Sequence, residues 1–244
     1  MIRIVKNPYA PDKRVSVAII SKDSPLDVFN SLEELGIKAI PTIPSMILQP
    51  YLANHPDMVL TPLGDGSVVA APSVWDYYNL ELSKFGIKVI KGNVEPSVQY
   101  PDDIPYNAAF LENTLIHKLD YSERVILEYA DKFEMLKLNT KQGYSKCSLA
   151  IVDNRSAITS DKGMAKLLNA NGFDLLLIEQ GYIDLPGMKY GFIGGATGLL
   201  SPKEMAITGT LERHPDKGRI EKFISQKGIS LIYLSAKPAI DIGT

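Results

Sequence analysis

The sequence predicts a five-bladed α/β propeller, because one arrangement of helix, glycine and strand recurs along its 244 residues. In four places a helix-forming stretch ends at a glycine and a short apolar strand follows at once; these glycines are Gly36, Gly86, Gly172 and Gly228. Glycine readily adopts the left-handed conformation that ends a helix, so each one marks the same boundary. A repeat of this kind along a whole chain is typical of propellers, solenoids and arrays.

A hairpin follows the helix and strand of each unit, and its first residue is small, polar or ionisable. The five starts are His55, Asn107, Cys147, Gly195 and Asp241, separated by 52, 40, 48 and 46 residues. The last hairpin is half complete at Thr244. We therefore expect Val15–Ile20, which precedes the first helix, to pair with Ile240–Thr244 and to close the ring without an open sheet edge.

The helices of the first two units carry sequence signals for their starts. Ser24 with Asp27, and Ser73 with Asp76, have the spacing of a capping box. Pro25 suits the first helical position. The later helices are expected near residues 122–132, from 161 to the glycine at 172, and at 219–226, and the third of the five units lacks a glycine at its helix end.

An ordinary doubly wound α/β sheet is the main alternative, since it also alternates strands and helices. Two features argue against it. The hairpins are antiparallel, and no glycine-rich phosphate loop opens a helix after the first strand. We interpret residues 1–244 as a single propeller domain.

The composition excludes several classes of partner and site. The net charge is −2, so no overall field favours nucleic acid or an anionic membrane. A single Cys excludes a disulfide framework and a Cys-based zinc site, and it fits a reducing compartment. No apolar stretch has the length of a signal peptide core or a membrane span. We expect a cytoplasmic protein with no cofactor, no metal, and no nucleic-acid or membrane partner; the sequence does not indicate the oligomeric state.

The hairpin starts, read cyclically from the fourth unit, give a distinctive order. They are Gly194-Gly195-Ala196-Thr197, Asp241, His55, Asn107 and Cys147-Ser148. A ring of five ββαβ units is the architecture of the pentein superfamily, also called the guanidine-modifying enzyme fold, and the chain most resembles the dimethylarginine dimethylaminohydrolases with circularly permuted blades. In that family an acidic blade start is followed by one with Gly-Gly-Asp, then a catalytic His, an Asn before an apolar strand, and a nucleophilic Cys near a Ser.

The resemblance implies roles for these residues. Cys147 would be the nucleophile, His55 the general acid and base, and Asp241 the carboxylate that orients the imidazole. Asn107, Asp57, Gly194, Gly195 and Thr197 would line the substrate site, which would hold a small-molecule ligand in the central channel. A nucleophilic thiol needs a base or a positive neighbour that lowers its pKa. If Cys147 pairs with His55, we expect its thiolate fraction to exceed that of a free Cys.

The chain departs from the family in two places. Gly194-Gly195 stands where the family carries a pair of carboxylates, so we expect poor activity on free arginine or its methylated forms and more space for a neutral or bulkier group. Asp57 or Asp65 could replace the charge only if the loop of His55 folds over the axis. The register is also ambiguous: aligning a family glycine with Gly143 puts Cys147 on the nucleophile, whereas aligning the Ser with Ser148 puts Lys146 there. On a strand, Lys146 would face away from Cys147.

Two hypotheses for the function remain open. The first is a Cys-dependent hydrolase or transferase acting on an amidine-like or other small polar substrate. The second is a non-catalytic binding protein, like the translation factor of this fold that keeps ribosomal subunits apart, although the near-neutral charge argues against a ribosomal partner.

Each candidate residue also has a purely structural interpretation. Cys147 could be a buried structural thiol. The tripeptide beginning at His55 recurs at His214, so only its position at a blade start singles it out. His117 is interpreted as a surface residue.

Overall fold

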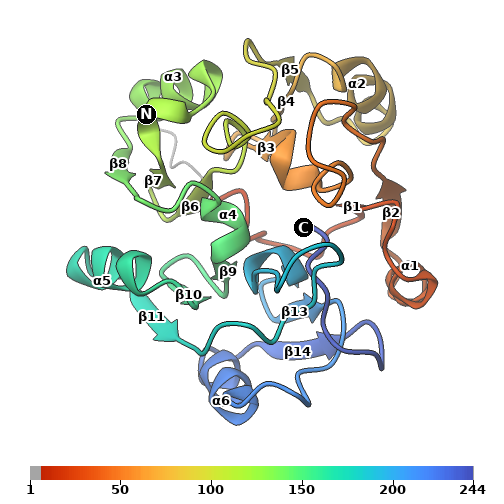
Figure 1. Ribbon diagram of the computed structural model, residues 1–244, viewed down its shortest axis with the longest axis vertical. Coiled ribbons are helices and arrows are strands. Elements are labelled where there is room, and N and C mark those ends of the chain that lie inside the picture. The colour runs from red at the N-terminus through yellow and green to blue at the C-terminus, as the bar shows by residue number, and fades with distance from the viewer. Residues whose placement is uncertain (1–6, 244) are drawn as a thin grey trace.

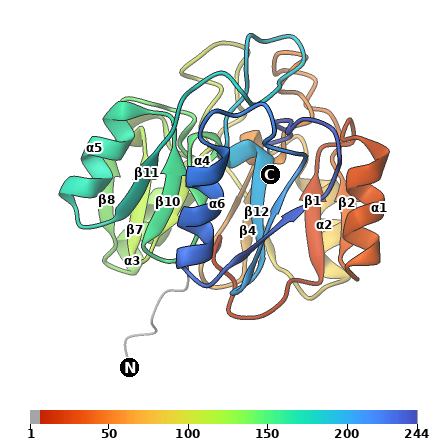
Figure 2. The same ribbon diagram turned by 90° about the horizontal axis from the view of Figure 1, so that it is seen from below.

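Five small sheets stand in a ring around a central axis, with one long helix outside each sheet (Figure 1). This computed structural model describes residues 7–243. The predicted five-bladed α/β propeller is confirmed. The side view shows the strands running roughly along the axis, with the helices on the rim (Figure 2). None of the helices within these residues is long and apolar enough to cross a membrane.

Four sheets share one topology, in which an antiparallel hairpin is followed by a helix and a third strand parallel to the second. The first contains β3 (Leu60–Pro62), β4 (Val68–Ala70), α2 (Trp75–Ser83) and β5 (Val89–Lys91). The second contains β6 (Ala109–Leu111), β7 (Thr114–His117), α3 (Arg124–Lys132) and β8 (Leu136–Asn139). The third contains β9 (Ala150–Ile151), β10 (Ser156–Thr159), α5 (Lys162–Ala170) and β11 (Asp174–Leu177). The fourth contains β12 (Thr197–Ser201), β13 (Glu204–Ile207), α6 (Lys217–Gln226) and β14 (Ser230–Tyr233).

The fifth sheet has two strands, β1 (Val17–Ile20) and β2 (Lys38–Pro41), which are parallel and joined by α1 (Leu26–Glu34). Short helical turns precede the first strand of three of the other sheets: η1 (Pro56–Met58), α4 (Ser145–Ser148) and η3 (Gly194–Ala196). A further turn, η2 (Leu119–Tyr121), precedes α3. The turns before the strands face the axis (Figure 1) and position the polar residues described below.

The glycines predicted to end helices all have positive φ, between 72° and 82°. The third unit lacks such a glycine, and Glu134 takes the left-handed conformation in its place, with a φ of 51°. A non-glycine residue pays a steric cost there. The glycines therefore marked the C-terminal ends of the helices correctly. The third unit has the same architecture although it has no glycine at this position.

The two predicted capping boxes are wrong. Pro25, not Ser24, precedes α1, and the Asp27 carboxylate accepts a hydrogen bond from the Ser235 hydroxyl 2.6 Å away. Ser73 likewise donates to Glu95 rather than capping α2. Tertiary partners from distant segments compete for these side chains, which local spacing cannot show.

The predicted pairing of Val15–Ile20 with Ile240–Thr244 is also wrong for the described residues. β1 pairs only with β2, and the last segment hydrogen-bonds to the fourth unit instead, from the Ile242 amide to the Gly195 carbonyl. It reaches the fifth unit through packing, since Ile20, Val28 and Ile242 share one hydrophobic cluster. Its end lies near the axis (Figure 1). Thr244 lies outside the described residues.

His117 is fully buried at the end of β7, which corrects its interpretation as a surface residue. Its Nδ1 lies 2.6 Å from the Ser122 hydroxyl. Burial lowers the pKa of His117 to about 4, because a charged imidazole would lose its hydration there. The folded protein therefore holds this imidazole in its neutral form.

This burial predicts a loss of stability in acid. An unfolded His has a pKa of about 6.5, so the unfolded chain takes up a proton before the folded one does. The free energy of unfolding should fall as the pH drops from about 6.5 towards 4, by up to about 3 kcal/mol from this group. Urea unfolding of the wild type and of His117→Gln at several pH values measures it. An equally steep decline in His117→Gln would contradict this origin.

Candidate functional site

The hairpin starts predicted from the sequence meet at the axis. His55 precedes η1, Asn107 precedes β6, Cys147 lies in α4, Gly195 lies in η3, and Asp241 lies in the final segment. All five are buried. The propeller therefore brings together residues from five separate units, as the repeat predicted.

Cys147 contacts one carboxylate and one amide. Its thiol lies 2.9 Å from Asp57 Oδ2, to which it donates, and 3.0 Å from Asn107 Nδ2. The Asn107 side-chain oxygen accepts hydrogen bonds from the backbone amides of Lys146 and Cys147, at 2.9 and 3.2 Å. The Asn107 amide also donates to the Asp57 carbonyl. Asn107 thus fixes the nucleophile candidate and the loop of Asp57 at once.

The imidazole of His55 approaches the carboxylate of Asp241. Their Nδ1 and Oδ1 atoms are 3.7 Å apart, which is beyond a hydrogen bond. The Asp241 carboxylate accepts hydrogen bonds from the backbone amides of Phe192 and Gly243, at 2.8 and 3.0 Å. Within residues 7–243, no hydrogen bond joins His55 to Cys147. Asp57 connects the two pairs electrostatically, since its carboxylate interacts with His55, Asp241 and Cys147.

Lys146 belongs to this site, although it was expected to face away. Cys147 was predicted on a strand, where neighbours alternate, but both residues lie in the helical turn α4. The buried ammonium donates to the Gly194 carbonyl at 2.9 Å and lies 5.4 Å from the centre of the Tyr9 ring. Burial lowers its pKa, while Asp57, Cys147 and Asp241 oppose that effect. The signal available in the sequence was a Lys directly beside the Cys, just before the apolar run Leu149–Val152.

The electrostatics contradict the expectation of a readily formed thiolate. Burial raises the pKa of Cys147 well above its usual range, and the Asp57 and Asp241 carboxylates raise it further. Burial also raises the pKa of Asp57, against the opposing charges of Lys146 and His55. The thiol is therefore protonated at neutral pH. Asp57 Oδ1 is a buried atom without a hydrogen-bond partner, as is His55 Nδ1.

Gly194 and Gly195 do not open space for a larger ligand group, which corrects the expectation. A Cβ on Gly195 would lie 1.9 Å from Asp241 Oδ1. A Cβ on Gly194 would lie about 2.5 Å from the backbone carbonyls of Lys146, Cys147 and Leu149. These glycines allow close packing of backbone and carboxylate around the axis. Thr197 donates from its hydroxyl to the Ile193 carbonyl.

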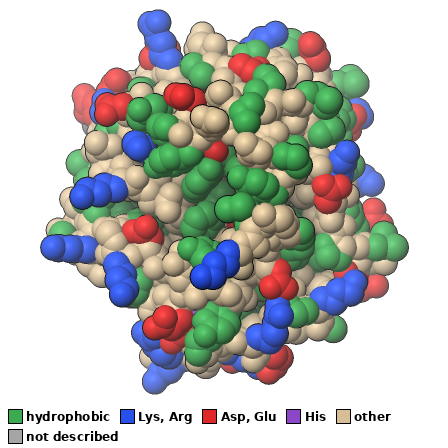
Figure 3. All heavy atoms as spheres, in the orientation of Figure 1, with side chains coloured by type: hydrophobic (Ala, Val, Ile, Leu, Met, Phe, Trp, Pro, Cys, Tyr) green, Lys and Arg blue, Asp and Glu red, His purple; other side chains and the backbone are tan. Residues whose placement is uncertain are grey.

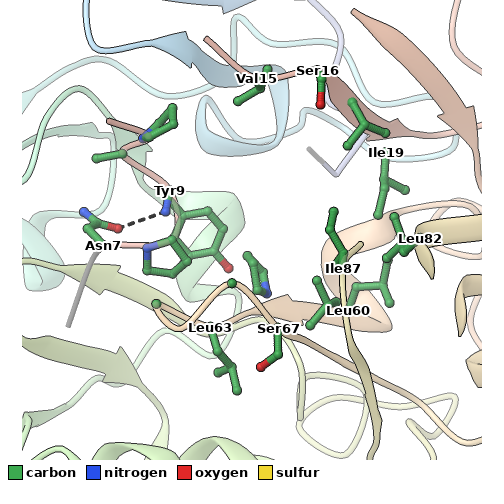
Figure 4. Close-up of a pocket in the computed structure, with 18 of the residues that line it drawn as sticks. Asn7, Tyr9, Val15, Ser16, Ile19, Leu60, Leu63, Ser67, Leu82 and Ile87 are labelled. Carbon is green, nitrogen blue, oxygen red and sulfur yellow. Dashed lines mark hydrogen bonds between the residues drawn. The ribbon is translucent and has the colours of Figure 1, made fainter. Parts of the chain in front are cut away.

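Three cavities border the polar cluster. The largest, of about 870 Å³, is mostly apolar and lies between β1 and the first sheet, with Asp57 among its lining residues (Figure 4). A small one of about 160 Å³ is lined by Lys146, Tyr9 and Thr197. The third, of about 380 Å³, is lined by His55 and Asp241. Cys147 lines none of these three, so the thiol is enclosed in this conformation.

The surface around the axis has no large field of one sign. Hydrophobic side chains gather near the centre of the face in Figure 3, and acidic and basic side chains alternate around its rim. Within residues 7–243, no three His, Cys, Asp or Glu side chains are placed together to hold a metal ion. The chemistry available at the axis is thus that of a thiol, an imidazole, two carboxylates and an ammonium.

Comparisons with known proteins identify the fold. The sequence model of a family of unknown function, DUF6873, matches residues 19–244. No curated protein matches the sequence significantly. Among solved structures, the inosamine-phosphate amidinotransferase StrB1 from Streptomyces griseus is similar, with a TM-score of 0.56, 11% identity, and coverage of 96% of this chain and 92% of that one.

Two further structures give the same result. A DDAH from Pseudomonas aeruginosa has a TM-score of 0.57 and 9% identity, covering 91% of each chain. An agmatine deiminase from C. jejuni has a TM-score of 0.57 and 9% identity, covering 95% of this chain and 90% of that one. At these identities the comparisons establish the fold, and the predicted pentein fold is confirmed.

The packing of Gly195 against Asp241 predicts the effect of a single methyl group. Gly195→Ala should destabilise the protein by about 1–3 kcal/mol, because the Cβ would displace the carboxylate. Gly198→Ala is the matched control, since no atom lies within 4 Å of its Cβ position; it should change stability by less than about 0.5 kcal/mol. Urea unfolding measures both. Equal stabilities of the two variants would contradict this packing.

The contact between Asp57 and Cys147 predicts how the thiol reacts. Iodoacetamide should label the native protein slowly, and Asp57→Asn should accelerate labelling, about tenfold for each unit by which the thiol pKa falls. His55→Ala should have a smaller effect, because His55 makes no hydrogen bond to the thiol. Asp131→Asn, at the exposed pair with Lys137, is the control. Mass spectrometry of Cys147 follows the rate, and an unchanged rate in Asp57→Asn would refute the coupling.

Proposed function

We propose that this chain, which belongs to the family of unknown function DUF6873, uses Cys147 to attack the central carbon of a small cationic amidine or guanidine. The observation that carries the proposal is the contact of the thiol with the buried carboxylate of Asp57, whose second oxygen has no partner. A planar cation with several N–H donors satisfies such an oxygen and offsets its charge.

Substrate binding would itself activate the thiol. The Asp57 and Asp241 charges raise the pKa of Cys147, so a cation placed beside Asp57 would reverse part of that effect. The thiolate would then be formed only when the electrophile is present. A resting thiol that is protonated and enclosed is consistent with this order of events.

The reaction would proceed in two balanced steps. Cys147 passes its proton to Asp57 as the sulfur forms a bond to the amidine carbon, and a C–N bond breaks as the leaving amine takes a proton from His55. A water molecule, or an acceptor amine in a transferase, then adds to the carbon while His55 takes its proton. The C–S bond breaks and the sulfur takes its proton back from Asp57; in hydrolysis the product releases its remaining excess proton to solvent. Asp241 would orient the imidazole of His55, which it approaches at 3.7 Å.

The shared fold supports a reaction of this class. The similar structures are named as amidinotransferases, an agmatine deiminase and a DDAH, so amidine and guanidine chemistry recurs on this fold. The buried cluster adds the support specific to this chain. A thiol, an imidazole and two carboxylates lie near one another at the axis, and groups of these kinds would supply the nucleophile, the acid and base, and the charge that such a reaction uses.

We also propose that free arginine is a poor substrate, but for a different reason than the sequence suggested. The charge missing at Gly194-Gly195 is present in Asp57, which contacts the thiol. The cavity beside His55, however, has no Lys or Arg among its lining residues. An amino acid's carboxylate would therefore meet the carboxylates of Asp23 and Asp241 there without a Lys or Arg partner.

A non-catalytic binding protein remains the second candidate. The observation that favours it is the enclosed, protonated thiol, which makes no hydrogen bond to His55. In that case the same cluster would bind a cationic ligand without reacting with it.

A pair of reagents of equal shape tests the proposal. Chloroacetamidine is a cation and chloroacetamide is neutral, and both alkylate thiols. The ratio of the amidine rate to the amide rate should be at least ten times larger for Cys147 than for free mercaptoethanol, because Asp57 holds the cation against the thiol. Asp57→Asn should abolish that preference. No preference in the wild type would contradict an amidinium site at Cys147.

A turnover assay distinguishes the proposed enzyme from the non-catalytic binding protein. A panel of alkylguanidines should yield an alkylurea and ammonia with the wild type and neither product with Cys147→Ser, whose folding is checked by circular dichroism. An amidine preference at Cys147 without turnover, with water or with added amines, would favour the binding protein.

A further inference from the structure

We propose that the largest cavity, between β1 and the first sheet, takes an apolar alkyl or aryl group carried by the substrate. The inference rests on the proposed function, because it assigns the part of the amidine or guanidine that does not react with Cys147. It narrows the substrate to a cation with a hydrophobic substituent.

Asp57 connects this cavity to the thiol. The residue is part of the cavity lining, and its Oδ2 atom lies 2.9 Å from the Cys147 sulfur. Of the three cavities described above, this one alone is lined by a residue that hydrogen-bonds to the thiol. Tyr9 also lines it, and burial and the nearby charges of Asp57 and Cys147 raise the pKa of its phenol. A cation held by Asp57 would therefore stand at the wall of this cavity, and its substituent would extend into the space.

The cavity lies where the fifth sheet lacks a strand. In the other four sheets the middle strand has an antiparallel neighbour on one edge and a parallel neighbour on the other. β1 corresponds to the middle strand, because β2 follows it in parallel after a helix, but within residues 7–243 it has no antiparallel neighbour. Three of the four β1 residues are partly exposed, whereas β7 and β10 are buried throughout. The fold thus leaves an apolar strand uncovered beside the axial site.

The lining has the chemistry of a hydrophobic subsite. Four of the lining residues pack in one hydrophobic cluster (Figure 4): Ile19, Leu60, Leu82 and Ile87. Apart from Asp57, the charged lining residues are 12–14, which are exposed, and Arg14 is paired with Glu204. A polar substituent would lose its hydration against the apolar wall, whereas an alkyl or aryl group is stabilised by leaving water. The volume of about 870 Å³ is that of a typical ligand-binding cavity.

Three reagents that alkylate thiols test this assignment. They are chloroacetamidine and its N-hexyl and N-[2-(2-hydroxyethoxy)ethyl] derivatives, whose two chains have the same length and differ in polarity. Mass spectrometry of Cys147 gives each labelling rate, which is divided by the rate for free mercaptoethanol. We expect the hexyl reagent to label the wild type at least ten times faster than the polar one, because its chain moves from water to the apolar lining.

Variants on two walls of the cavity show whether this advantage arises there. Val17 on β1 and Val68 on β4 both line the cavity and are partly buried, so a Trp at either position takes up part of the space. Val17→Trp and Val68→Trp should each reduce the hexyl advantage at least threefold, and either variant suffices if the other fails to fold. Leu26→Trp is the matched control, since Leu26 is 73% exposed and lines none of the three cavities. It should keep the full advantage.

Two results would overturn the subsite and leave the proposed function intact. One is equal normalised rates for the hexyl and polar reagents, and the other is a hexyl advantage that both Trp variants retain in full. The proposed function is judged separately, by the preference of wild-type Cys147 for unsubstituted chloroacetamidine over chloroacetamide. If that preference is absent, the proposed function fails and the subsite fails with it.

Discussion

The side chain of Asn107 is the constraint on which the axial site depends. This fully buried amide uses its oxygen to accept from the backbone amides of Lys146 and Cys147, and its nitrogen contacts the Cys147 thiol and the Asp57 carbonyl. It therefore joins the segments that precede the first strand in three neighbouring units. A buried amide that lost one of these partners would leave polar groups unsatisfied, which is costly in a low-dielectric interior. The geometry of the thiol is thus a consequence of how the units meet, more than of the local sequence around Cys147.

The charges at the axis, together with burial, explain why the Cys147 thiol is protonated in this conformation. Two buried carboxylates, Asp57 and Asp241, lie near the buried ammonium of Lys146 and the imidazole of His55. Burial raises the pKa of Cys147, and the carboxylates of Asp57 and Asp241 raise it further, so the thiol keeps its proton. In the proposed reaction, a cationic ligand would change that balance in the direction of a thiolate, whereas a neutral ligand would not. The same cluster would then distinguish ligands by charge before any reaction takes place.

The sequence was sufficient for the repeat and for the convergence of its hairpin starts, because glycines such as Gly86 and Gly172 impose their conformation locally. It failed where a distant partner decides the outcome. Ser73 bonds to Glu95 instead of capping its helix, and the Asp241 segment joins the fourth unit instead of β1. Lys146 was misplaced because a helical turn, not a strand, precedes β9. These are properties of tertiary contacts, and spacing alone does not encode them.

The pair Gly194-Gly195 shows why a missing charge in a motif is weak grounds for a missing function. Compared with the resembling family, these two residues lack a pair of carboxylates. The space above Gly195 is nevertheless filled by the Asp241 carboxylate, and Asp57 supplies a second carboxylate at the thiol. In this chain the carboxylates near the axis are those of Asp241 and Asp57, and Gly195 leaves room for the first of them. In a propeller a carboxylate at one blade start can take the place of one at another, because residues at the start of every blade reach the same axis. Function in this fold is therefore better judged from the set of groups around the axis than from any one blade's motif.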